Sequence, residues 1–299
     1  MLRVRNLNAC VGGTDADRVH ILRNISFDVS SNEIVGMLGE SGAGKSMAAR
    51  AIMGLTPSAV KISYDELVTS DVKISMIFQH PTMALNPVFT IGEQMMETLL
   101  LHKLADNKTN ARKAATTLLA EMGIDYPAER LNSYPHQLSG GMNQRVMIAL
   151  ALAASPRLLL ADEPTTALDV IIQAQIIKLL MDLRYKRKLA MLFISHNIAL
   201  VERIADRVIV MTAGEIVEVI DKERLARGDV RHPYTKALKE CVPSLAKRGE
   251  PLATIAGRMA KNTADYANRC IFCERCPNAM DRCRREKPVL ADGVACFAC

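Results

Sequence analysis

The sequence has no apolar run long enough to cross a membrane and no segment with the pattern of a secretory signal. The longest apolar stretch, residues 146–154, is far shorter than the roughly 18 residues that a membrane-spanning helix needs. The first six residues include two arginines instead of an apolar run. We therefore expect a chain that stays in the cytosol and that would work at a membrane only through a partner.

A strong excess of one charge is also missing. The net charge is +6, and residues 243–299 hold ten Lys and Arg against six Asp and Glu, which places +4 of it in the tail. Nucleic-acid-binding proteins usually carry a stronger and more focused basic surplus. The composition therefore favours a solvated basic tail over a nucleic-acid-binding surface.

The distribution of apolar residues predicts a main domain with an appendage. A chain of 299 residues that is 49% hydrophobic can bury one large core or two modest ones. Alternating apolar and polar residues at Leu2 and Val4, and again over residues 25–29, predict strands of a half-exposed antiparallel layer. Further along, buried strands alternate with loops and helices, a pattern typical of a parallel sheet covered on both faces.

The same pattern gives the positions of individual elements. Residues 91–122 predict two helices, the second beginning near Asn110 and ending at Gly123. They indicate a helical subdomain at about residues 88–155. Periodicity is lost through residues 247–251, which look like a linker. The other expected elements are strands at residues 34–38, 157–161 and 189–194 and helices at residues 47–55, 170–183 and 197–205.

A glycine-rich loop follows the strand predicted at residues 34–38. It fits the pattern G-x-x-x-x-G-K-S of a phosphate-binding loop between a strand and a helix. Glycines let backbone N–H groups turn toward phosphates, and the helix N-terminus adds positive potential. Lys45 is predicted to contact the terminal phosphates, and the hydroxyl of Ser46 is predicted to bind Mg²⁺. The loop consists of Gly39, Glu40, Ser41, Gly42, Ala43, Gly44, Lys45 and Ser46.

The strand predicted at residues 157–161 ends in two carboxylates, Asp162 and Glu163. Ligands of parallel sheets bind at the carboxyl ends of the strands. Asp162 is predicted to hold the Mg²⁺ shell, and Glu163 to orient the attacking water or take its proton. By itself such a pair could be a solvated strand end, but together with the phosphate loop it predicts a hydrolytic site.

A second helix-terminus anion site is predicted at Ser139, Gly140 and Gly141, which precede the apolar helix of residues 146–154. One monomer has no need for two cradles for the same phosphate, so this one is expected to act across a dimer interface. A simple helix cap is the alternative interpretation.

Taken in order, these motifs resemble the ATPase subunit of ATP-binding-cassette (ABC) transporters over residues 1–242. The resemblance implies an α/β fold: a P-loop NTPase core with a parallel sheet, a small antiparallel β subdomain and a helical subdomain. A Cys-rich C-terminal appendage is expected at residues 243–299. The matching positions are Gly39 to Ser46, Gln79, Leu138 to Arg145, Asp162, Glu163, Asp169 and His196.

The resemblance also implies roles and partners. Gln79 would contact Mg²⁺ and the attacking water, Asp169 would join two active sites across a dimer, and His196 would contact the γ-phosphate. ATP and Mg²⁺ would be cofactors of a hydrolysing, energy-coupling subunit. Its partners would be a second cassette, identical or related, two transmembrane permease subunits and, indirectly, a solute-binding protein, but no nucleic acid. Its location would be peripheral, on the cytoplasmic face of the plasma (inner) membrane.

Two segments indicate a branch of the family. Residues 231–238, which contain His-Pro-Tyr-Thr, and residues 81–87 are similar to the ATPases of dipeptide, oligopeptide and nickel importers. The cargo among these stays open. The alternative function is a soluble cassette ATPase acting on DNA or the ribosome, but such proteins typically carry coiled-coil insertions or two cassettes in one chain.

Six of the eight cysteines lie in the last thirty residues. In a reducing compartment such a cluster is more often a metal site than a set of disulfides. Cys270, Cys276, Cys283 and Cys296 resemble the pattern by which some members of this branch bind a [4Fe–4S] cluster. Four thiolates suit Zn²⁺ equally well by count, so zinc is the alternative.

Two departures from the family pattern are evident. Family members usually stack adenine on an aromatic residue near the first hairpin, but residues 1–26 contain no Phe, Tyr or Trp. The equivalent position falls near Val19 or His20. The interval from Lys45 to Gln79 is also short, so the antiparallel subdomain is expected to be small.

Overall fold

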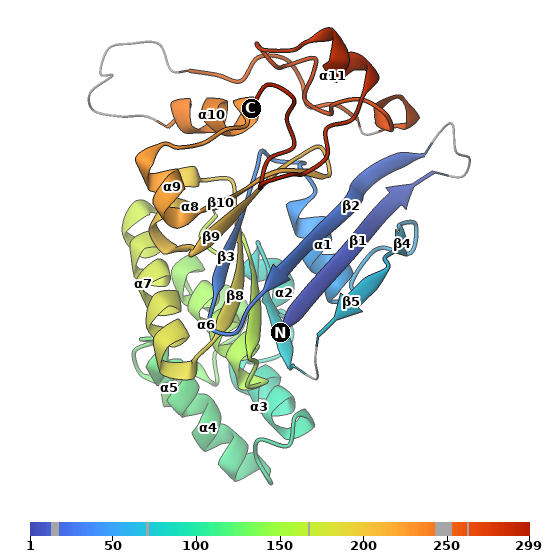
Figure 1. The fold of residues 1–299 in the computed structure, drawn as a ribbon. Helices are drawn as coiled ribbons and strands as arrows, with labels where there is room; N and C mark the ends of the chain where they lie inside the picture. The colour runs from blue at the N-terminus through green and yellow to red at the C-terminus, as the bar shows by residue number, and fades with distance from the viewer. Residues whose placement is uncertain (13–17, 70–71, 167, 243–252, 262) are drawn as a thin grey trace. The chain divides into compact units, whose positions relative to one another are not determined.

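The computed structural model describes residues 1–12, 18–69, 72–166, 168–242, 253–261 and 263–299. The chain forms two compact units (Figure 1). The first consists of residues Met1–Ser70 and Phe193–Cys299, and the second of residues Asp71–Leu192. Each unit is described by itself.

The first unit contains an antiparallel sheet that confirms the predicted half-exposed layer. Leu2 pairs with Val29 and Val4 pairs with Phe27, and all four side chains are buried on one face. The strand order is β2-β1-β4, and β5 also pairs with β1. The last two strands have three residues each, as expected from the short interval before Gln79. The strands are β1 (Leu2–Val11), β2 (Val19–Val29), β4 (Lys61–Ser63) and β5 (Glu66–Val68).

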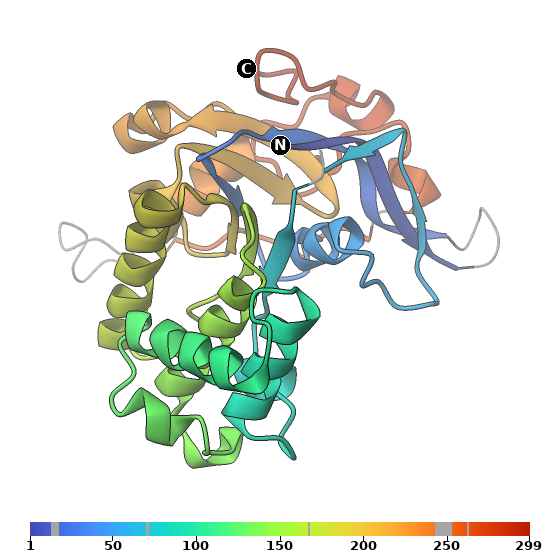
Figure 2. The same cartoon turned by 90° about the horizontal axis from the view of Figure 1, so that it is seen from below.

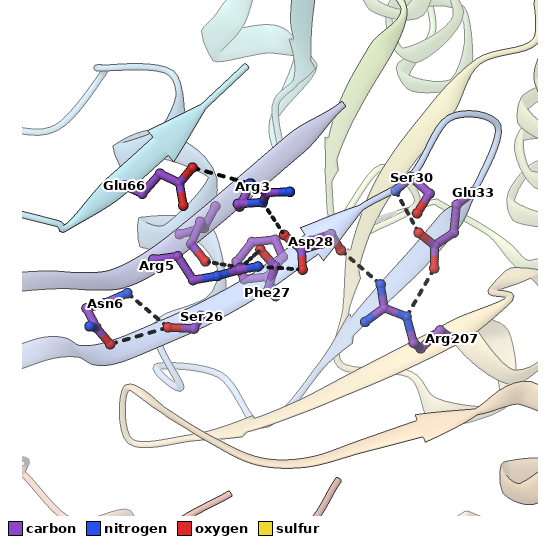
Figure 3. A network of polar contacts seen from close by, with 11 residues as sticks. Arg3, Arg5, Asn6, Ser26, Phe27, Asp28, Ser30, Glu33, Glu66 and Arg207 are labelled. Atoms are coloured by element: carbon purple, nitrogen blue, oxygen red, sulfur yellow. Dashed lines mark hydrogen bonds and ion pairs between the residues drawn. The ribbon is translucent and has the colours of Figure 1, made fainter. Parts of the chain in front are cut away.

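Polar side chains on strands β1, β2 and β5 of this sheet contact one another (Figure 3). Asp28 accepts a hydrogen bond of 2.9 Å from Arg5 and lies 3.7 Å from Arg3, which also pairs with Glu66 at 3.5 Å. The side chains of Arg3 and Asp28 are about half exposed, so such pairs add little to stability. The Arg207 side chain donates to Glu33 at 3.0 Å and to the Asp28 carbonyl at 2.9 Å.

A second group of strands in the first unit carries the phosphate loop. Strand β3 runs parallel to β9, and β9 runs antiparallel to β10. All five residues of β3 are buried, as expected for a parallel strand covered on both faces. These strands are β3 (Ile34–Leu38), β9 (Arg207–Thr212) and β10 (Glu215–Asp221). The helices of this unit are α1 (Lys45–Ile52), α8 (Ile198–Ile204), α9 (Lys222–Arg227), α10 (Pro233–Glu240) and α11 (Asp281–Arg285).

The second unit joins two parallel strands to a group of helices, of which α3, α4 and α6 pack on one another (Figure 2). The two helices predicted over residues 91–122 are confirmed, with Thr90 and Asn107 as their N-caps. The strands are β6 (Ile74–Ile77) and β7 (Leu158–Asp162). The helices are α2 (Pro81–Ala84), α3 (Ile91–Leu101), α4 (Lys108–Glu121), α5 (Pro127–Arg130), α6 (Gly140–Ala153) and α7 (Val170–Arg187).

Strand β8 (Ala190–Ser195) begins in the second unit and ends in the first. Two 3₁₀ turns, Pro135–Gln137 and Ala264–Tyr266, complete the regular elements described. Within the described residues, no helix combines the length and the apolar character that crossing a bilayer requires.

The cysteine-rich extension belongs to the first unit, and in its described residues the regular elements are α11 and the 3₁₀ turn Ala264–Tyr266 (Figure 1). Its last residues lie against β10. Val219 N–H donates to the Gly293 carbonyl at 2.7 Å, and Ala295 N–H donates to the Val217 carbonyl at 2.9 Å. The linker predicted at residues 247–251 lies outside the described residues.

Candidate functional site

The phosphate loop lies where the sequence predicts it, between β3 and α1. Lys45 is buried, and its ammonium donates to the carbonyls of Gly39 at 2.8 Å and Glu40 at 2.9 Å. A Cβ atom on Gly39 would lie 2.2 Å from the Met211 carbonyl oxygen, so only glycine fits there. Gly44 caps α1 with φ +97°, a left-handed conformation that glycine adopts readily. The loop backbone is therefore shaped by glycines at both of its ends.

Two residues that were not predicted as part of the site contact this loop. Tyr234 in α10 accepts a hydrogen bond from the Glu40 N–H, and Arg275 in the extension pairs with the Glu40 carboxylate. In the sequence, residues 231–238 are visible only as a marker of a family branch, and Arg275 only as the neighbour of Cys276. Nothing in their local pattern points to the loop.

In the second unit, the carboxylates at the end of β7 are found as predicted. Asp162 is buried. Glu163 has φ +46°, a left-handed conformation that is unusual for a glutamate and that often marks a functional position. Its Oε2 accepts hydrogen bonds from Gln79 Nε2 at 3.3 Å and from Thr166 Oγ1 at 2.8 Å. The structure thus brings Gln79 and Glu163 together.

The Ser-Gly-Gly segment begins α6. Ser139 is the N-cap, and its hydroxyl accepts from the Met142 N–H at 3.3 Å, so Ser139 fixes the start of the helix. Gly140 has open space where a Cβ atom would be, which leaves the helix terminus accessible to a ligand. Asn143 is buried and donates to the Pro135 carbonyl at 2.9 Å, which fixes the turn before the helix.

Asp169 is the N-cap of α7. Its carboxylate accepts from the N–H groups of Ile171 at 3.0 Å and Ile172 at 2.9 Å. The neighbouring side chains of Val170 and Ile171 are 80% and 71% exposed. Asp169 therefore fixes the start of α7, which carries two exposed apolar side chains.

His196 follows β8 in the first unit and is exposed. Ser195 Oγ accepts from the Asn197 N–H at 3.0 Å, and Asn197 caps α8, so the turn that carries His196 is fixed on both sides. Lys45, Ser46 and His196 therefore lie in the first unit. Gln79, Asp162, Glu163, Asp169 and Ser139 to Gly141 lie in the second.

On the side where adenine is expected, His20 lies in β2 opposite Cys10 of β1. Burial, followed by the charges of Arg23 and Arg18, lowers the pKa of His20. The ring is therefore neutral at physiological pH. A neutral imidazole is a flat but small surface for a base to stack on.

The cysteines of the extension lie near one another. Burial, with the neighbouring thiols of Cys283, Cys273 and Cys276, raises the pKa of Cys270 to about 12. Burial and Cys296 raise the pKa of Cys276. A thiol that binds a metal ion must lose its proton. Among the described residues, no group of three or more His, Cys, Asp or Glu side chains is placed to hold a metal ion.

Comparison with known proteins gives consistent matches. A family model described as ABC transporter matches residues 22–166, and one described as Oligopeptide/dipeptide transporter, C-terminal region, matches residues 217–283. The dipeptide transport ATP-binding protein DppD of Escherichia coli (strain K12) is 44% identical, over 98% of this chain and 94% of its own. DppD of Bacillus subtilis (strain 168) is 40% identical, over 96% and 90%.

The fold is also similar to that of a solved ATP-binding cassette. The dimeric, post-hydrolysis ATP-binding cassette MJ0796 bound to ADP and Pi aligns with a TM-score of 0.63 at 28% identity. The alignment covers 74% of this chain and 99% of that one.

Proposed function

The chain belongs to the ABC transporter family, and on that premise we propose that it is the ATP-hydrolysing, energy-coupling subunit of a membrane importer for peptides. One observation carries the proposal. A phosphate loop and the Asp162-Glu163 pair occur in the same chain as a region that matches the oligopeptide and dipeptide transporter C-terminal model. The relatives compared above are dipeptide transport proteins by name. Nickel is the other cargo that the sequence resemblance suggests.

In this proposal the residues divide the work of hydrolysis. The backbone of Gly39 to Ser46 surrounds the phosphates, and Lys45 neutralises their charge. Ser46, Gln79 and Asp162 are the residues that would hold Mg²⁺, which when bound offsets charge on the transferred phosphoryl group. Glu163 orients the attacking water and takes its proton. Its support is the hydrogen bond from Gln79 and the contact from Thr166.

The remaining site residues are proposed to act between two cassettes. Ser139, Gly140 and Gly141 of one cassette would close over the phosphates bound by the other, and Asp169 would join the two sites. His196 would contact the γ-phosphate. The accessible start of α6 and the exposed side chains after Asp169 support this arrangement. The second cassette is a copy of this chain or a related one.

The domain boundaries and location follow the same proposal. Residues 1–242 form the cassette, with a helical subdomain at about residues 88–155, and residues 243–299 form the extension. Dimerisation driven by ATP moves two permease subunits, which receive peptide from a solute-binding protein. The chain is then peripheral, on the cytoplasmic face of the inner membrane.

A metal site in the extension remains a separate proposal. Its support is the spacing of Cys270, Cys276, Cys283 and Cys296. Binding a [4Fe–4S] cluster or Zn²⁺ would require these thiols to lose protons and to move together. Anaerobic purification followed by iron, sulfide and zinc analysis tests it. Loss of a stoichiometric metal in Cys276→Ser supports the site, and no metal in the unaltered chain rejects it.

The function is tested by co-purifying the chain with its permease and solute-binding proteins and measuring ATP hydrolysis with dipeptides, longer peptides and nickel. Stimulation by a peptide supports the proposal, and Lys45→Ala should abolish turnover. Nickel as the sole stimulant would replace peptide as cargo. Salt-sensitive nucleic-acid binding without membrane partners would favour the soluble alternative instead.

A further inference from the structure

The second residue of the phosphate loop is held at three points. The Glu40 N–H donates to Tyr234 Oη at 2.9 Å. The Glu40 carboxylate accepts two hydrogen bonds from Arg275, Nη1 to Oε2 at 2.8 Å and Nη2 to Oε1 at 2.9 Å. The Glu40 carbonyl accepts from the Lys45 ammonium at 2.9 Å. One loop residue therefore connects the C-terminal region with the lysine of the phosphate site.

The position of Arg275 is fixed before it reaches Glu40. Its Nε donates to the Ala256 carbonyl at 2.9 Å, and its guanidinium lies 5.7 Å from the centre of the Phe272 ring. The side chain is only 6% exposed. The planar guanidinium matches both carboxylate oxygens at once, which a lysine ammonium cannot do. Pairing with Glu40 raises the pKa of Arg275.

Tyr234 is fixed in the same way by its surroundings. It is fully buried, and its ring lies 5.3 Å from that of Phe272, centre to centre. Its N–H donates to Nδ1 of His232, the N-cap of α10, at 3.0 Å. The buried Glu218 accepts from the His232 N–H at 3.1 Å. Packing, rather than the hydroxyl alone, therefore sets where Tyr234 Oη meets the loop.

We propose that Arg275 and Tyr234 are positioning residues for ATP binding, acting through Glu40. They hold the start of the loop in one conformation, together with the lysine that is bonded to the same residue. A loop ordered beforehand avoids the cost of ordering it when the ligand binds. The C-terminal region thus sets the affinity for ATP. It does not set the rate of the chemical step, because Glu163, the residue proposed to act on the attacking water, is held by Gln79 and Thr166. This inference rests on the proposed role of the loop in ATP binding.

The first test compares Arg275→Gln with the unaltered full-length chain. The dissociation constant of a fluorescent ATP analogue should rise about tenfold, the effect expected for one charge-assisted pair. The turnover number at saturating ATP should change less than about twofold. Arg275→Lys should be intermediate, because it keeps the charge but loses the second hydrogen bond. Tyr234→Phe, which removes only the hydroxyl, should weaken binding by roughly threefold.

The matched control is Arg269→Gln. Arg269 belongs to the same extension and pairs with Glu274 at 3.1 Å, and the carboxylate it meets is exposed and outside the loop. The affinity of the Arg269→Gln variant for the ATP analogue should equal that of the unaltered chain. Loss of affinity in Arg269→Gln equal to that in Arg275→Gln would overturn the proposal, because any disturbance of the extension would then suffice.

A double-mutant cycle isolates the pair. Glu40→Gln alone should weaken binding as Arg275→Gln does, and the double variant should bind no more weakly than either single one. Additive losses would overturn the proposal. So would a lower thermal midpoint in Arg275→Gln with an unchanged dissociation constant, since Arg275 would then only stabilise the fold. If the proposed function itself fails, the unaltered chain does not bind the analogue.

Discussion

Two glutamates follow buried strands in the two units of this chain, and their partners differ. Glu40 comes after β3 and is bonded through both carboxylate oxygens to an arginine. Glu163 comes after β7 and accepts from two neutral side chains, Gln79 and Thr166, on one oxygen. A position at a strand end brings a carboxylate to the ligand-binding edge. In the proposed roles, the carboxylate paired with an arginine anchors a loop, and the carboxylate bonded to Gln79 and Thr166 takes a proton from water.

The comparison is tested most strongly by making the same change at both glutamates. Glu163→Gln should lower the turnover number by about 10²–10⁴-fold, because an amide cannot take the proton of the attacking water. Its affinity for ATP should change less than about twofold. Steady-state ATPase assays and nucleotide titration measure the two quantities separately. Full turnover in Glu163→Gln would remove its assigned role.

Glu40→Gln should show the opposite pattern, with affinity for ATP lowered about tenfold and turnover at saturation nearly kept. The same assays apply. A turnover loss comparable to that of Glu163→Gln would show that the two carboxylates do not have separate roles.

His232 caps the helix that carries Tyr234, the residue bonded to the Glu40 N–H. Burial lowers the pKa of His232 from 6.5 to about 4. The unfolded chain therefore binds a proton between pH 6.5 and 4 that the folded chain does not. The contribution of His232 to the free energy of unfolding is therefore fully present above pH 6.5. It falls as the pH drops toward 4, by up to about 3 kcal/mol.

His232→Asn keeps an N-cap for α10 but does not titrate. Urea unfolding of both chains at pH 7.5 and pH 5 measures the difference. The unaltered chain should lose more stability between the two pH values than the variant does. Equal losses would show that His232 does not contribute to the pH dependence.

The smallest effect is expected at the exposed ion pairs of the antiparallel sheet (Figure 3). Arg3 is more than half exposed and pairs with Glu66 at 3.5 Å. Arg3→Gln should therefore shift the thermal midpoint by less than about 2 °C and leave ATP affinity unchanged. A larger effect on affinity than that of Arg275→Gln would show that surface charge, and not the anchor at Glu40, governs binding.

Most local features could be predicted from the sequence. The strand at residues 34–38 and the two helices within residues 91–122 were predicted from apolar patterning and capping residues, which act over a few positions. The phosphate loop and the Asp162-Glu163 pair were found because their chemistry depends on spacing along one segment. The structure places each of them on the expected element.

Other features depend on packing between distant segments. Glu40 and Arg275 are 235 positions apart in the chain, and Glu40 and Tyr234 are 194 apart, so no local pattern could pair them. The cysteines show the same limit, because their spacing suggested a metal site, while among the described residues no group of three or more His, Cys, Asp or Glu side chains is placed to hold one. The sequence by itself determined the phosphate-handling segments, whose geometry is local. Only the tertiary structure decided what anchors them, since long-range contacts and desolvation arise from how the folded segments pack.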